Sequence, residues 1–220
     1  MKNLLFIFAL SVNTYCFTTQ AQDTSPQYLD SLVNNFVAGL KNQGIDTICI
    51  FEDYWTTGQP FVTGEKDWCY TKHTYIPVYV LWRQGGKSYL SKKDNCFDYS
   101  TTEVRAEAIW KYYFDNRAAI KPEKSKPFQL STSVNGKLSL TTITDDRTGH
   151  RNIKVITASD TVKKQFDTFQ LQATAKNGNQ TEVNINYGHN QKLLSKRLAE
   201  FLADFVLEAE KKKLLVRSLR

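Results

Sequence analysis

The chain has 220 residues, of which 41% are hydrophobic and 23% charged, and its formal net charge is +7. These values are ordinary for a globular protein and exclude a chain that is disordered throughout. A long apolar run occurs only near the N-terminus, which excludes a protein with several membrane-spanning helices. The modest positive charge is spread along the chain and mainly favours solubility.

The first 21 residues have the three parts of a secretory signal peptide. Lys2 supplies a positive charge, and the apolar stretch Leu4–Val12 is too short to cross ~30 Å of hydrocarbon as a helix. Thr19 and Ala21 are small residues of the kind that precede a cleavage site. We therefore expect cleavage before Gln22 and a mature protein, periplasmic or extracellular, that is not an integral membrane protein.

Three cysteines remain once Cys16 leaves with the signal peptide. Cys49 lies in an apolar, strand-like run and is expected to be buried and inert. Cys69 and Cys96 lie in polar sequence, and an oxidising compartment favours a disulfide between them over two free thiols. Closing their separation of 27 residues would add about 3.5 kcal/mol of stability in the chain-entropy model.

The first predicted elements are a helix and a strand. Ser25 and Pro26 are typical of a helix start, apolar residues then recur at helical spacing as far as Leu40, and Gly44 ends the helix. A strand is expected over residues 46–54, and a loop rich in glycine and proline follows it.

Gly85 and Gly86 give the clearest turn signal in the chain. They separate two strand-like runs, 75–84 and 87–92, as expected for a tight hairpin whose turn residues need positive φ. This register places Trp82 opposite Tyr89. The run 75–84 is apolar on both faces, so we expect both faces to be covered.

The second half of the chain predicts two helices and two further hairpins. Residues 100–103 have the form of a capping box before a helix over 104–117, and Asn190 is expected to cap the last helix. A turn at Asn135-Gly136 joins strand-like runs over 128–134 and 137–143, and a turn at residues 177–179 joins runs over 168–175 and 181–187. We predict a single α+β domain over residues 22–220, with three main helices packed on a largely antiparallel sheet built from hairpins; a division into two lobes near residues 121–126 is the alternative.

Acidic residues offer two candidate sites for chemistry. Glu52 and Asp53 are paired carboxylates of the type that glycosidases use, which suggests a hydrolase of envelope polymers or glycans as an alternative function. Asp145, Asp146 and His150 share one polar segment that could bind a divalent cation or run acid/base chemistry, although such residues are also typical of a solvated turn. Ligand spacing typical of zinc sites and a glycine-rich phosphate loop are both missing, so we predict no metal and no cofactor.

Aromatic residues are unusually dense between residues 51 and 99. Rings displayed on loops stack on sugar faces or anchor protein partners, and Tyr54, Trp55 and Trp68 lie in sequence expected to form such loops. The lysines of residues 87–93 lie near aromatic residues but within no recognisable nucleic-acid motif, so we expect no specific nucleic-acid partner.

The signal ending in Ala21-Gln22, together with Gly86-Lys87-Ser88-Tyr89-Leu90 and Asp94-Asn95-Cys96-Phe97, resembles small secreted proteins of Bacteroidota-type bacteria that have no assigned activity. The resemblance covers a minor part of the chain, implies a compartment, and carries no catalytic residues. The leading hypothesis is an exported, non-enzymatic binding or accessory protein of the cell envelope. Its partner would be a protein or a glycan held by the aromatic-rich region.

Overall fold

The computed structural model describes residues 23–56, 61–62, 70–71, 73–134, 137–177 and 180–218. Four α-helices lie in these ranges: α1 (Pro26–Asn42), α2 (Glu107–Ile120), α3 (Tyr187–Gln191) and α4 (Leu194–Lys211). The strands of the main sheet are β1 (Ile48–Trp55), β4 (Val78–Gln84), β5 (Lys87–Lys93), β6 (Asp98–Tyr99), β7 (Thr102–Val104), β10 (Gly149–Ile156), β11 (Thr161–Asp167) and β14 (Arg217–Ser218). The other elements are β2 (Phe61–Val62), β3 (Tyr70–Thr71), β8 (Phe128–Val134), β9 (Lys137–Ile143), β12 (Thr174–Asn177), β13 (Gln180–Val183) and a 3₁₀ turn, η1 (Phe169–Leu171).

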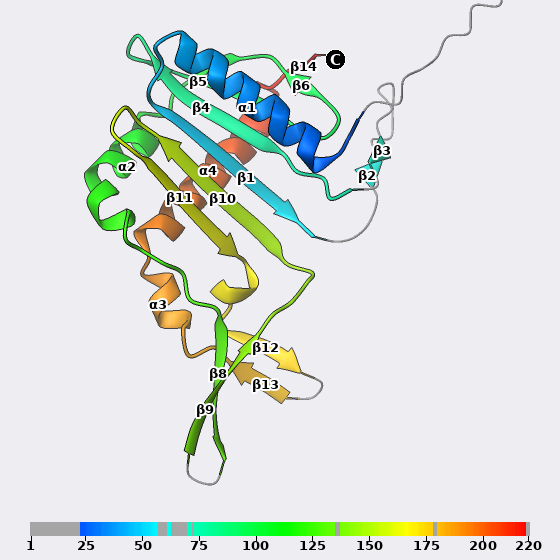
Figure 1. Cartoon of the computed structure of the whole chain (residues 1–220), viewed down its shortest axis with the longest axis vertical. Coiled ribbons are helices and arrows are strands. Elements are labelled where there is room, and N and C mark those ends of the chain that lie inside the picture. Colours follow the sequence, from blue (N-terminus) through cyan, green and yellow to red (C-terminus); the bar gives the residue numbers. More distant parts are fainter. Residues whose placement is uncertain are drawn as a thin grey trace, which may run out of the picture.

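The main sheet has the strand order β11-β10-β1-β4-β5-β6-β14, and β7 also pairs with β5 (Figure 1). Every pairing in it is antiparallel. Helices accompany this sheet, which confirms the predicted α+β class. Near its middle, β1 pairs with β10 along its whole length and with β4 over Ile48 to Glu52.

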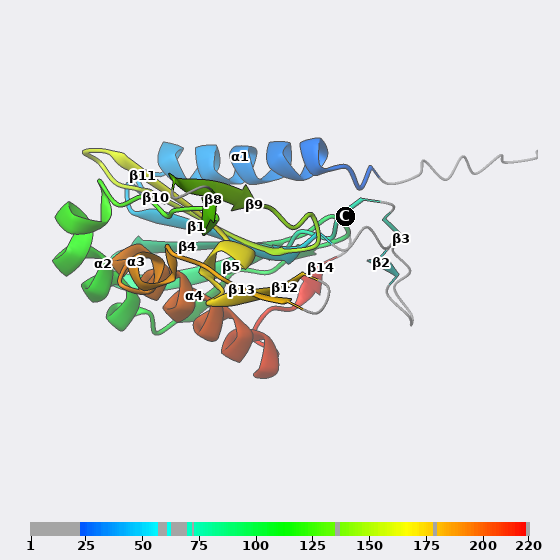
Figure 2. The ribbon, with the colours of Figure 1, turned by 90° about the horizontal axis from the view of Figure 1, so that it is seen from below.

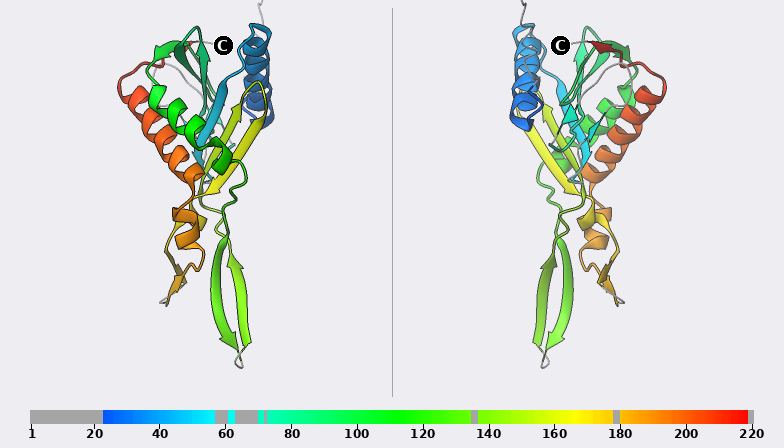
Figure 3. Two further views of the ribbon diagram at one scale, coloured as in Figure 1. Left: turned by 90° about the vertical axis from the view of Figure 1, so that its left-hand side faces the viewer. Right: turned by 90° about the vertical axis from the view of Figure 1, so that its right-hand side faces the viewer.

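Helices cover both faces of the sheet, with α1 on one side and α2 and α4 on the other (Figures 2 and 3). Strand β4 shows how the sequence achieves this. Val80 and Trp82 pack in the cluster that contains α1, whereas Tyr79 and Leu81 pack in the cluster that contains α2 and α4. Alternate side chains of a strand point to opposite faces, so a strand between two buried layers is apolar throughout. The expectation that both faces of this strand are covered is confirmed.

A long hairpin formed by β8 and β9 projects away from the body of the molecule (Figures 1 and 3). Serine and threonine dominate its sequence, and its exposed side chains include Leu138 (80%) and Leu140 (60%). The smaller hairpin of β12 and β13 lies beside its base, where the Ile185 amide donates to the Gln129 carbonyl. Both hairpins were predicted, and the structure confirms the first with its bounds. The second is shorter than predicted, because residues 169–171 form η1 and α3 begins at Tyr187.

Local signals predicted α1 and the first hairpin correctly. The Ser25 side chain accepts a hydrogen bond from the Tyr28 amide, and Pro26 occupies the first position of α1. Gly85 and Gly86 have φ values of 59° and 80°, as the tight turn requires. The rings of Trp82 and Tyr89 stack with their centroids 5.7 Å apart, which confirms the predicted register.

The predicted capping box at residues 100–103 is wrong. Thr102–Val104 form β7 instead, which pairs with Ser88–Leu90 of β5, and α2 begins only at Glu107. The physical reason is tertiary, because these residues pair with the edge of β5 and bury Val104 against the core.

The predicted cap of the last helix is also wrong. Asn190 is buried within α3, where its amide group donates to the carbonyls of Lys126 and Gln170. The following helix, α4, begins at Leu194, whose amide donates to the carboxylate of Glu123. A side chain distant in sequence therefore caps α4, which local patterns do not reveal.

Strands β10 and β11 were not predicted, although they form one side of the main sheet. On their inner face, Ile153, Val155, Val162 and Phe166 belong to the core cluster that contains α2 and α4, and Arg151 and Lys164 share this face. Their other face is polar, so the apolar residues alternate with lysine, asparagine and glutamine. This partial alternation, broken by Lys163-Lys164, is the strand signal that the sequence carries here.

None of the helices within the described ranges is long and apolar enough to cross a lipid bilayer. The predicted signal peptide, residues 1–21, lies outside the described residues, so export stays a prediction.

Candidate functional site

Strand β1 carries four of the residues predicted to form sites, and its pleat divides them between the two faces of the sheet. Glu52 and Tyr54 lie on the face of α1, in phase with the buried Ile50. Asp53 and Trp55 lie on the face of α2 and α4. Tyr54 and Trp55 end a strand rather than occupying a loop, which corrects their predicted setting.

Glu52 and Asp53 therefore do not form a convergent carboxylate pair. Glu52 Oε2 accepts a hydrogen bond of 2.7 Å from Asn152 Nδ2 on one face. Asp53 Oδ2 lies 3.1 Å from Arg151 Nε on the other face. A glycosidase places both carboxylates on the same substrate bond, and these two side chains point away from each other.

Burial raises the pKa of both carboxyl groups, but their partners differ. For Glu52, the hydrogen bond from Asn152 opposes the effect of burial, and the neighbouring charge of Asp30 adds to it. For Asp53, the positive charge of Arg151 opposes the effect of burial on the pKa. The positive charge of Lys154 also opposes the effect of burial on the pKa of Glu52, which lies beside α1.

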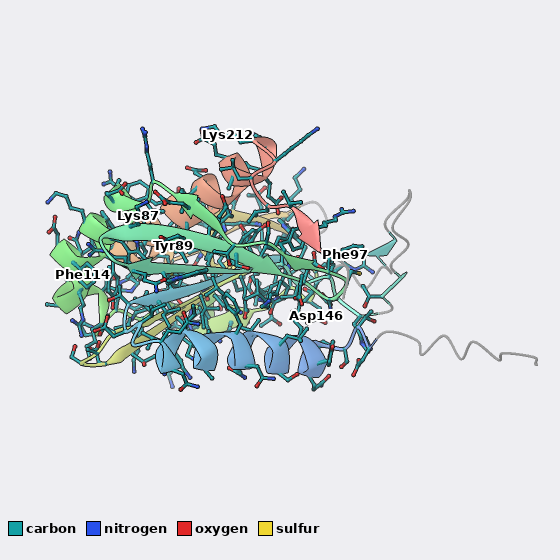
Figure 4. The ribbon with its side chains drawn as sticks, turned by 90° about the horizontal axis from the view of Figure 1, so that it is seen from above. Lys87, Tyr89, Phe97, Phe114, Asp146 and Lys212 are labelled. Atoms are coloured by element: carbon teal, nitrogen blue, oxygen red, sulfur yellow. The ribbon has the colours of Figure 1, made fainter. Side chains whose placement is uncertain are left out.

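The segment of Asp145, Asp146 and His150 does not form a site of converging groups. Asp145 Oδ1 accepts a hydrogen bond of 2.9 Å from the Arg147 amide, which is a local turn, and both aspartates are exposed. In the view of Figure 4, Asp146 and Phe114 of α2 lie on opposite sides of the molecule. His150 lies in β10, and its ring packs at 5.1 Å from that of Tyr54. The solvated-turn interpretation describes the two aspartates.

Among the described residues of this region, Trp55 has an exposed ring, with 58% of its surface accessible. Its indole lies against Gly149, because a β-carbon added at Gly149 would come within 3.1 Å of Trp55 Cε2. The Gly149 amide donates to Thr168 Oγ1 at 2.9 Å, and the Thr168 amide donates to the Gly149 carbonyl at 2.8 Å. Because Gly149 has no side chain, the indole of Trp55 can pack directly on the backbone of β10, which its hydrogen bonds to Thr168 hold in place.

Polar groups lie on the same face as Trp55. Asp53, two residues earlier in β1, pairs with Arg151, and Arg151 also lines a groove of about 420 Å³ against α4. Arg197 and Phe201 of α4 contribute to this groove, with the Arg197 guanidinium 5.4 Å from the centre of the Phe201 ring. We call Trp55, Asp53, Arg151, Arg197 and Phe201 the α4-side surface.

A second groove, of about 430 Å³, lies on the opposite face beside α1. We call it the α1-side groove and define it by Asp30, Asn34, Glu52, Asn152, Lys154 and Lys163. In this groove Glu52, a predicted site residue, lies beside residues of β10 and β11, the two strands that were not predicted. The period-2 alternation of β10 and β11 would have placed Asn152, Lys154 and Lys163 on one face.

The cysteine predictions are tested only in part. Cys49 is buried and has a free thiol, and burial raises its pKa to about 12, so the expected inert role fits. Cys96 is buried as well. Cys69 and Trp68 lie outside the described residues, so the Cys69–Cys96 disulfide and a binding role of Trp68 stay predictions.

Among the residues that the structure describes, no group of three or more His, Cys, Asp or Glu side chains is placed to hold a metal ion. In comparisons with protein families, curated proteins and solved structures, nothing matches this chain. Inferences about its function therefore come from its own surfaces.

Proposed function

We propose that this protein is an exported, non-enzymatic binding protein of the cell envelope that holds a glycan against the indole of Trp55. The main observation behind this proposal is the exposed indole of Trp55, which packs against Gly149. Gly149 is in turn held by its hydrogen bond to Thr168. A tryptophan side chain is costly to leave in water, and a supported flat ring is suited to stacking on the apolar face of a sugar.

The neighbouring side chains support a polar ligand. The carboxylate of Asp53 and the guanidinium of Arg151 lie on the same face and are both partly accessible, so they can accept from and donate to sugar hydroxyl groups. The groove against α4 continues this surface through Arg151. A mixture of aromatic and arginine side chains is also typical of protein interfaces, so a protein partner is the second outcome that a binding test must separate.

The hydrolase alternative receives less support. Glu52 and Asp53 face opposite sides of the sheet, and Asp145 and Asp146 belong to an exposed turn. Neither pair brings two carboxyl groups to one bond, which is what acid-assisted glycoside hydrolysis needs.

Sedimentation with insoluble peptidoglycan tests this function. Replacement of Trp55 by alanine should weaken retention at least about tenfold, without lowering the melting temperature, because an exposed ring contributes little to stability. Leu207→Ala, at a residue of α4 with 50% exposure, is the matched control and should bind like the wild type.

Three results would contradict the proposal. Equal retention of wild type and Trp55→Ala would remove Trp55 from the binding surface. Release of soluble sugar fragments by the wild type, abolished by Glu52→Gln, would establish the hydrolase instead. Retention on envelope proteins but not on glycans would assign the surface to a protein partner.

A further inference from the structure

The face of the sheet beside α1 is only half covered. Buried residues of α1 pack on β1 and β4 through Val33, Val37, Ile50, Val80 and Trp82. Figure 1 shows that α1 lies along this part of the sheet and leaves most of β10 and β11 without a helix on that face. Their uncovered positions carry polar side chains, which form the floor of the α1-side groove.

Two lysines lie directly opposite each other in this floor. Lys154 of β10 is the register partner of Lys163 of β11, and like charges in this arrangement repel. Neither ammonium group lies within 4.0 Å of a carboxylate among the described residues, although ten other ion pairs occur there. The charge of Lys154 acts on Glu52 in the same groove, where it opposes the effect of burial on the pKa of that carboxyl, but it forms no close ion pair with it. Two positive charges side by side in a concave surface are suited to an anionic group.

The other end of the groove has a different chemistry. Asn152 lies two residues from Lys154 along β10, a distance of about 7 Å, and its amide is already directed at Glu52. Together the amide and the carboxyl present donors and acceptors side by side, which suits the adjacent hydroxyl groups of a sugar. Asn34 and Asp30 of α1 line the opposite wall with further polar groups.

We infer that the α1-side groove binds a carbohydrate that carries a negative charge. Lys154 and Lys163 face its anionic group, and the Glu52–Asn152 pair faces its hydroxyl groups. The volume of about 430 Å³ falls within the range of small-molecule sites. This site is separate from the α4-side surface, because the sheet lies between them, and it does not depend on the role of Trp55.

Titration of the purified protein at low ionic strength tests this inference. The probes are glucuronate, glucose 6-phosphate, glucose and inorganic phosphate, followed by calorimetry and by backbone amide NMR shifts. We expect at least one charged sugar to bind with a dissociation constant of about 1 mM or below, and glucose to bind at least about tenfold more weakly. The perturbed amides should lie in β10 and β11.

The variants assign the interaction to the lysines. Replacing both Lys154 and Lys163 by glutamine should weaken binding of the charged sugar at least about tenfold, while the melting temperature stays the same or rises because a repulsion is removed. The matched control is Lys137→Gln, at an exposed lysine of the β8–β9 hairpin, which should bind like the wild type.

Several outcomes would overturn the inference. Absence of binding for both charged sugars, or equal affinity in the double variant, would show that the lysines form no site. Inorganic phosphate binding as tightly as glucose 6-phosphate would show that the sugar is not recognised. Amide shifts around Trp55 and Arg151 instead of β10 and β11 would place the ligand on the α4-side surface. If the inference holds, the affinities of the two charged sugars identify the anionic group: tighter binding of glucuronate indicates a carboxylate, and tighter binding of glucose 6-phosphate indicates a phosphate.

Discussion

Lys92 Nζ lies 2.6 Å from Glu210 Oε1, and this ion pair joins β5 to the last turn of α4. The Lys92 side chain is only 8% exposed and is surrounded by the rings of Tyr75, Tyr79 and Tyr99. Burial opposes ionisation of Glu210, but the hydrogen bonds from Lys92 and Tyr79 outweigh it and lower the pKa of Glu210. The packing of α4 on the sheet therefore includes a compensated buried charge.

Glu210→Ala should lower the free energy of unfolding by about 2 kcal/mol, because it leaves the buried ammonium of Lys92 without its nearest partner. Glu208→Ala, two residues earlier on α4, removes an exposed pair with Lys212 and should cost less than about 0.5 kcal/mol. Urea denaturation of both variants measures the difference. Equal effects would show that Lys92 does not depend on Glu210.

Glu52→Gln should remove a pH-dependent contribution to the stability of the protein. Burial raises the pKa of Glu52 in the folded state, so this group favours folding when protonated and loses that contribution as the pH rises through its folded-state pKa. A neutral glutamine can still accept the hydrogen bond from Asn152. The variant should therefore melt a few degrees higher than the wild type at pH 7, and the gap should close below the ordinary glutamate pKa of 4.5. A gap that does not change with pH would contradict this assignment.

Gly149→Ala tests the packing of Trp55 against β10. A methyl group at this position would lie 2.9 Å from Thr168 Cγ2 and 3.1 Å from Trp55 Cε2. The free energy of unfolding of the variant should therefore fall by about 1–3 kcal/mol, and the fluorescence of Trp55 should shift. Gly39→Ala in α1 meets no atom within 4 Å and should instead stabilise the protein by up to about 1 kcal/mol. Thermal melts that show the same sign for both substitutions would contradict the described packing.

Export predicts a covalent link between Cys69 and Cys96. Peptide mapping of the native protein without reductant should find these two residues joined and Cys49 unmodified, because Cys49 is buried. Reduction should lower the free energy of unfolding by about 3.5 kcal/mol. Alkylation of both Cys69 and Cys96 in the unreduced native protein would contradict the link.

Local chemistry made part of the fold predictable. The turn at Gly85-Gly86 and the start of α1 at Ser25-Pro26 depend on a few adjacent residues, and the structure confirms both. The helix start predicted at residues 100–103 failed because pairing with β5 outweighs a local capping pattern. Long-range pairing of this kind is absent from any short window of sequence.

The candidate sites were less predictable than the fold. Glu52 and Asp53 are neighbours in the chain, but the pleat of β1 sends them to different faces with different partners. Arg151 of the α4-side surface and Gly149, against which Trp55 packs, lie in a strand that was not predicted. Once β10 is placed beside β1, the register of the two strands pairs Glu52 with Asn152 on one face and Asp53 with Arg151 on the other, whereas the walls of the grooves come from α1, β11 and α4.

Hydroxyl-radical footprinting of Trp55 tests the proposed function most directly. In the isolated protein the exposed indole should be oxidised readily, because 58% of its surface is accessible. With saturating peptidoglycan its oxidation should fall severalfold, while that of Leu207 on α4 stays the same. Equal oxidation of Trp55 with and without bound glycan would contradict the claim that a glycan is held against this ring.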